Sequence, residues 1–132
     1  MKNIFLETNS YSRYSKGDFG LDKLVSTANR IYISVITIGE LYYGFKKGVR
    51  ENKNLELLKT FLGDSRVRIL KVNITTSKIY GVVKYLLISK GRPVPENDIW
   101  IAAQAIEAES VLLTYDRHFL EIPQVKVWRK LK

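Results

Sequence analysis

Short apolar runs rich in β-branched residues alternate along the chain with longer segments whose apolar residues recur at helical spacing. Such runs favour buried strands, and they lie at residues 3–6, 31–35, 67–72, 111–114 and 125–128. Strands that are separated throughout by helices favour a mainly parallel sheet covered on both faces. The pattern therefore predicts an α/β domain built on a five-stranded sheet.

The segments between these runs carry residues that start and stop helices. Thr37 is expected to cap the helix after the second run, and Gly48 to end it. Helices are expected to start near Thr8, Leu21, Thr37, Asn52, Asn73 or Thr75, Asn97 or Asp98, and, as a short turn, Arg117.

The helix after Pro95 has an unusual proportion of small residues. One face is expected to carry Ile99, Ala102, Ala103 and Ile106. Gln104 is expected to lie elsewhere on the same helix. Small side chains on the inner face would let this helix approach the sheet closely.

Length and composition limit the class of protein. A chain of 132 residues fits a single domain over residues 1–132, large enough to bury a core without metal or disulfide support. The absence of cysteine excludes thiolate chemistry and cysteine-ligated zinc, and it suits a reducing cytoplasm. Residues 1–7 match neither a signal peptide nor a membrane span. We therefore expect a cytoplasmic protein with no membrane partner.

The chain is strongly basic, with 22 Lys and Arg against 13 Asp and Glu and a formal net charge of +9. The excess is spread along both halves of the sequence rather than gathered in a tail. Such a field favours a polyanionic partner, most plausibly nucleic acid. Charge alone leaves this open, because solvated lysines are common on ordinary surfaces.

Four acidic residues are expected near the ends of the predicted strands. Glu7 follows the first run, Glu40 lies on the helix after the second, Asp98 starts a helix, and Asp116 follows the fourth run. Each alone has an ordinary explanation as a helix-end or surface charge. Right-handed crossovers, however, bring the carboxyl ends of parallel strands to one edge of the sheet, where such folds bind ligands.

Clustered carboxylates are the ligands that Mg²⁺ and Mn²⁺ prefer, and without a cation they would repel one another. An acidic pocket in a basic protein suits cleavage of phosphodiester bonds, since the surface holds the polyanion while metal ions activate water. The residues thus predict a metal-dependent nuclease site.

Four motifs in order carry a resemblance to a known family. They are IFLETNSY, ISVITIGELYYG, GRPVPENDIWIAAQA, and VLLTYDRHF followed by VKVW. Together, at this chain length, they resemble the PIN-domain ribonucleases, and within that family the VapC-type toxins of bacterial and archaeal toxin–antitoxin pairs.

The resemblance implies a three-layer α/β/α fold and a Mg²⁺- or Mn²⁺-dependent endoribonuclease acting through one or two ions. The family's acidic positions correspond to Glu7, Glu40, Asp98 and Asp116, expected as metal ligands and catalytic residues. Its polar positions near the metal correspond to Thr114, also expected as a catalytic residue, and then to Asn9 and Ser34. The implied partners are an RNA substrate, a VapB-type antitoxin that directs a basic side chain toward the acids, and a second copy in a homodimer.

Two residues, Glu7 and Tyr115, depart from the family's pattern, and a third, His118, lies two positions after the acid Asp116. The first acid of the family is usually aspartate, whereas Glu7 is one methylene longer. The catalytic activity of this chain could therefore be weaker than that of other family members. Tyr115 stands where a small polar residue is common. His118, the only histidine, is interpreted as a surface turn residue, with a metal-site role as the alternative.

Two other functions stay open at this stage. The chain could be a non-catalytic RNA- or partner-binding module in which Glu7 and Tyr115 prevent metal binding. It could also be a housekeeping RNA-processing nuclease with the same site.

Overall fold

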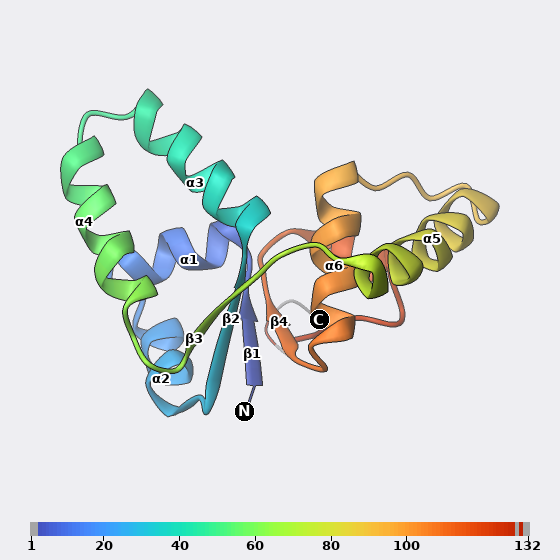
Figure 1. Cartoon of the computed structure of the whole chain (residues 1–132), viewed down its shortest axis with the longest axis horizontal. Coiled ribbons are helices and arrows are strands. Elements are labelled where there is room, and N and C mark those ends of the chain that lie inside the picture. Colours follow the sequence, from blue (N-terminus) through green and yellow to red (C-terminus); the bar gives the residue numbers. More distant parts are fainter. Residues whose placement is uncertain (1–2, 129, 131–132) are drawn as a thin grey trace.

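The computed structural model describes residues 3–128 and residue 130, and its centre is a five-stranded sheet in the order β3-β2-β1-β4-β5 (Figure 1). Every pairing in the sheet is parallel. The strands are β1 (Asn3–Leu6), β2 (Arg30–Ser34), β3 (Val67–Leu70), β4 (Val111–Leu113) and β5 (Lys126–Val127). The predicted five-stranded parallel sheet is confirmed, with each strand within a few residues of its apolar run.

Helices cover both faces of the sheet. Figure 1 shows α1 to α4 on one side and α5 and α6 on the other, which gives the predicted three layers. The helices are α1 (Thr8–Ser15), α2 (Phe19–Thr27), α3 (Val35–Lys47), α4 (Glu51–Leu62), α5 (Ile74–Ser89) and α6 (Glu96–Glu107), followed by the short 3₁₀ helix η1 (Arg117–Glu121). Each described helix is too short or too polar to cross a membrane.

The central strands are buried on both faces, as expected for a parallel sheet covered by helices. Ile4, Phe5 and Leu6 of β1 have no exposed surface. In the register, Leu6 pairs with Ile33 of β2 and with Leu113 of β4. The residues that follow these three strand ends therefore meet at one edge of the sheet.

Helix α3 begins earlier than predicted. Its N-cap is Ser34, whose hydroxyl accepts a hydrogen bond from the Ile36 N–H at 3.0 Å. Thr37, the predicted cap, is instead fully buried in the first turn. The prediction was wrong because strand β2 runs directly into the helix, so the cap is the last strand residue rather than a residue in a connecting loop.

Helix α6 is buried on more sides than its sequence indicated. Ile99, Ala102 and Ala103 are buried as predicted, but Gln104 is also fully buried. Its side-chain nitrogen donates to the Leu70 carbonyl at the end of β3, at 3.1 Å. Gln104 thus fastens α6 to the sheet, a contact between distant segments that helical periodicity does not reveal.

Candidate active site

The four predicted acids come from four different elements around the carboxyl edge of the sheet. Glu7 directly follows β1 and is the N-cap of α1, while Asp116 follows β4 and is the N-cap of η1. Asp98 lies in the first turn of α6, and Glu40 lies near the middle of α3. The fold thus brings to one region residues that are more than a hundred positions apart in the sequence.

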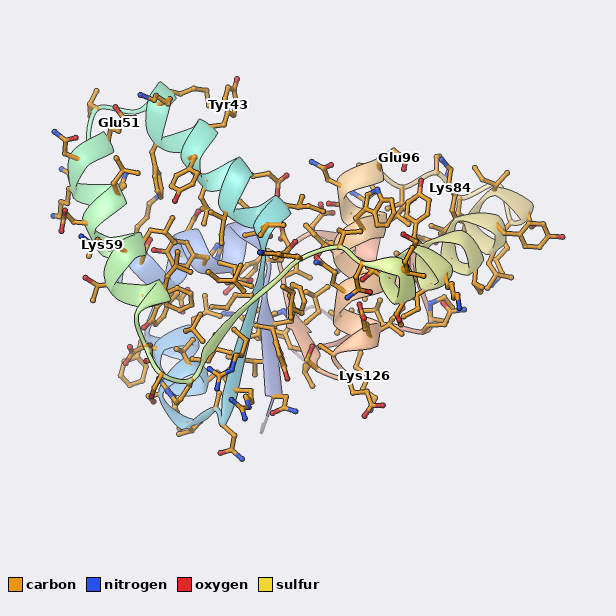
Figure 2. All side chains as sticks on the ribbon, viewed as in Figure 1. Tyr43, Glu51, Lys59, Lys84, Glu96 and Lys126 are labelled. Carbon is orange, nitrogen blue, oxygen red and sulfur yellow. The ribbon has the colours of Figure 1, made fainter. Side chains whose placement is uncertain are left out.

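The start of α6, which carries Asp98, is held against α5 by side-chain contacts. Figure 2 labels Lys84 of α5 and Glu96 of α6, whose side chains form an ion pair between the two helices. Tyr80 and Trp100 stack with ring centroids 3.9 Å apart. These contacts fix the first turn of α6 and therefore the position of Asp98.

Three side chains form a compact group of potential metal ligands: Asp98, Asp116 and His118. One ligand atom from each lies within 4.8 Å of the others. His118 Nδ1 lies 2.7 Å from Asp116 Oδ1 and 3.9 Å from Asp98 Oδ2. Among the described residues, no other such group of three is found, and Glu7 and Glu40 are not part of it.

Glu7 is joined to this group through Thr114. The Thr114 hydroxyl donates to Glu7 Oε1 at 2.7 Å, and its oxygen accepts the backbone N–H of Asp116 at 3.0 Å. Glu7 and Thr114 are both buried. Thr114, predicted as a polar residue of the site, therefore positions two acids at once.

Glu40 is the most peripheral of the four acids. Its Oε1 accepts a 2.6 Å hydrogen bond from the hydroxyl of Thr8, the residue after Glu7. It also lines an open pocket of about 240 Å³ between α1 and α3, together with Lys16. Glu40 thus contacts the cluster through α1 rather than directly.

Burial, together with the charges of neighbouring acids, raises the pKa of Asp98 and of Glu7. Burial, followed by the negative charges of Asp116 and Glu7, raises the pKa of Asp98 to about 7. Burial also raises the pKa of Glu7, a change that the hydrogen bonds from Thr114 and the Thr8 backbone oppose and that the charges of Glu40 and Asp116 reinforce. The site therefore favours bound protons or a cation in place of unpaired negative charge.

This donor set fits a divalent cation. Carboxylate oxygens from several elements converge, and a cation would offset both the burial and the repulsion that raise the pKa of Asp98. Raised carboxyl pKa values in a shared site are themselves typical of functional residues.

The remaining predicted residues have structural roles beside the cluster. Asn9 Oδ1 accepts the Tyr115 N–H at 3.0 Å and so joins α1 to the loop after β4. Ser34 caps α3, as described above. Tyr115 lies under Arg13, whose guanidinium carbon is 3.8 Å from the ring centroid.

His118 is the member of the group that sequence reasoning set aside as a surface residue. Asp116 caps η1 by accepting the His118 N–H at 2.9 Å, which brings the imidazole back toward the acids. The only available signal was its spacing, two residues after an acid that follows a strand.

Comparisons with known proteins agree with this geometry. The sequence pattern of the PIN domain matches residues 4–125. A ribonuclease VapC2 from Haemophilus influenzae is 34% identical over 93 residues, which cover 70% of this chain and 68% of that protein. The tRNA(fMet)-specific endonuclease VapC of Salmonella typhimurium is 28% identical over 130 residues, which cover 96% of this chain and 97% of the other.

Solved structures show the same similarity over nearly the whole chain. The crystal structure of DNA-bound VapBC from Salmonella typhimurium aligns with a TM-score of 0.83 at 28% identity, covering 97% of this chain and 98% of that one. VapBC2 from Rickettsia felis bound to a promoter DNA fragment aligns with a TM-score of 0.82 at 28% identity, covering 96% and 97%.

Proposed function

The chain belongs to the PIN-domain family, and on that premise we propose that it is a divalent-metal-dependent endoribonuclease of the VapC type, the toxin of a toxin–antitoxin pair. The observation that carries the proposal is the convergence of Glu7, Asp98 and Asp116 at the carboxyl edge of the sheet in a chain of net charge +9. The relatives named as ribonucleases support the same reaction class.

Asp98 and Asp116 are the residues that would hold Mg²⁺ or Mn²⁺, with Glu7 and Glu40 completing the acidic surroundings. When bound, such an ion supplies a Lewis acid that activates water and stabilises charge on the phosphate and the leaving oxygen. Thr114 keeps the Glu7 carboxylate oriented by a buried hydrogen bond. Glu7 is buried and its carboxylate is oriented by Thr114. Its side chain, although longer than that of aspartate, is therefore compatible with a role beside the ion.

Basic side chains next to the acids suit an RNA backbone. Arg13 stacks on Tyr115, and the Lys130 ammonium lies 5.7 Å from the centroid of the same ring. Tyr115 lies in the loop between β4 and η1, directly before Asp116 in the sequence, so both positive charges contact the segment that carries one of the acids. We assign them to binding of the phosphates that flank the scissile bond.

The proposed partners are a cognate antitoxin and a second copy of the chain in the cytoplasm. The similar solved structures from Salmonella typhimurium and Rickettsia felis are VapBC assemblies. The acids repel one another, and a basic side chain of the antitoxin placed among them would neutralise part of that negative charge. Helix α5 exposes the apolar side chains of Ile74, Val82, Tyr85 and Ile88, and we assign this face to the dimer.

The decisive experiment is RNA cleavage by the purified chain with Mg²⁺ or Mn²⁺, compared with the Asp116→Asn variant and with EDTA. We expect fragments with a 5′-phosphate from the wild type and at least a hundredfold lower rate from the variant. Intact RNA across varied substrates, together with no calorimetric binding of Mn²⁺, would favour the non-catalytic module. Cleavage without growth arrest on induction would favour a housekeeping nuclease.

A further inference from the structure

We infer that His118 is a direct metal ligand in the acidic cluster and that it shifts the preference of the site from Mg²⁺ toward transition-metal ions such as Mn²⁺. This inference rests on the proposed function, because it concerns the same metal site. It concerns a side chain that contributes nitrogen to a site otherwise built from oxygen.

The position of the imidazole is the first step. His118 Nδ1 lies 2.7 Å from Asp116 Oδ1 and 3.9 Å from Asp98 Oδ2. Neighbouring ligand atoms around an octahedral ion with bonds of about 2.1 Å lie about 3 Å apart. The three side chains therefore need to move by only about 1 Å or less to share one ion.

The backbone makes this position a property of the fold. Asp116 Oδ1 accepts the His118 N–H at 2.9 Å, so the acid that binds the ion also fixes the turn carrying the imidazole. Helix η1 contacts α6, which carries Asp98, and Phe119, the next residue, is fully buried. The imidazole is thus anchored on both sides, although about half of its side chain is exposed.

The chemistry of the donor atom gives the preference. Mg²⁺ binds oxygen and dehydrates reluctantly, whereas imidazole nitrogen favours first-row transition ions. Replacing one oxygen donor by nitrogen therefore lowers the relative affinity for Mg²⁺. A histidine that only oriented Asp116 through their 2.7 Å contact would leave the preference of the ion unchanged.

The chain has one histidine, which makes the test direct. Pulsed EPR of the Mn²⁺-loaded full chain should show modulation from an imidazole nitrogen, and the signal should vanish in His118→Gln. Calorimetry should show the ratio of Mn²⁺ to Mg²⁺ affinity falling about tenfold in His118→Gln. Circular dichroism melting of the metal-free variant checks that it folds.

Each outcome decides the inference separately from the proposed function. Bound Mn²⁺ without imidazole modulation, or an unchanged affinity ratio in His118→Gln, overturns the role of His118 and leaves the nuclease proposal standing. If wild-type chain binds no Mn²⁺ and cleaves no RNA, both proposals fail. If Mn²⁺ binds with imidazole modulation but RNA stays intact, the ligand assignment holds and the nuclease proposal fails.

Discussion

The Thr114 hydroxyl donates a 2.7 Å hydrogen bond to Glu7 Oε1 across 107 positions of sequence, and both side chains are buried. The bond is possible because Leu6 and Leu113, the residues before them, pair in the parallel sheet. The same hydroxyl oxygen accepts the Asp116 N–H at 3.0 Å. One small side chain thus links the ends of β1 and β4 to two of the acids.

Replacing Thr114 by Val should weaken both stability and cleavage. Valine keeps the shape but removes the hydroxyl, which leaves a buried Glu7 oxygen and the Asp116 N–H without their partner. We expect the free energy of unfolding to fall by about 1–3 kcal/mol and the rate of RNA cleavage to fall at least tenfold. Urea unfolding and a cleavage assay measure these changes. Thr114→Ser, which keeps the hydroxyl, is the control and should stay near wild type in both.

Glu7→Gln should change stability and metal binding in opposite directions. The Gln carbonyl can still accept the Thr114 hydroxyl, while the variant no longer has to bury a carboxylate whose pKa is raised by burial. At pH 8 the metal-free variant should therefore be as stable as wild type or more stable. Loss of one negative charge should lower Mn²⁺ affinity at least tenfold, as read by calorimetry. A variant that lost stability yet kept wild-type Mn²⁺ affinity would show that Glu7 is a structural residue.

The sequence was sufficient for the sheet and the candidate acids, because both depend on local pattern. An apolar run such as residues 111–114 needs no tertiary information to be recognised as a buried strand, and the acids that follow two such runs had to meet at one edge. The distances between the four acids could not be predicted from the sequence. The sequence could not show that Glu40 reaches the cluster only through Thr8, since that depends on how α3 packs.

The residues whose roles were not predicted depend on contacts between distant segments. Gln104 looks like a surface residue until β3 presents the Leu70 carbonyl to it. His118 keeps the exposed position that was predicted, and only the approach of its Nδ1 to within 3.9 Å of Asp98 Oδ2 depends on a distant segment. Polar residues are assigned to the surface by periodicity, and a buried polar partner from another element overrides that assignment.

Asp98 should give the metal-free protein a stability that declines toward neutral pH. Its pKa is raised to about 7 in the fold, whereas an unfolded aspartate titrates near 3.9. Folding therefore favours the protonated form: this contribution is fully present below about pH 4 and is lost as the pH rises through about 7. The unfolding free energy of wild type relative to Asp98→Asn should fall by about 4 kcal/mol from pH 4 to pH 8. Urea titrations in EDTA measure it, and a difference that does not vary with pH would contradict the shift.

The same raised pKa predicts that metal binding releases protons. At pH 6.5 much of the Asp98 population is protonated, and a carboxylate must lose its proton to bind a cation. Calorimetric titration of Mn²⁺ in two buffers of different ionisation enthalpy should show release of roughly half a proton or more per ion. At pH 8.5 the release should be close to zero. Equal release at both pH values would mean that Asp98 is not the group that the ion displaces.

Arg13 should contribute specifically to RNA affinity. It is exposed, stacks on Tyr115 beside Asp116, and has no carboxylate within salt-bridge distance among the described residues. Arg13→Gln in the catalytically impaired Asp116→Asn background should weaken RNA binding severalfold and reduce the slope of log affinity against log salt by about 0.7. Arg30→Gln is the matched control, because Arg30 is also exposed but begins β2 at the opposite edge of the sheet. Fluorescence anisotropy with a labelled RNA over a salt series measures both. Equal losses in the two variants would mean that RNA binds through the general positive charge of the surface and that Arg13 has no specific place beside the acids.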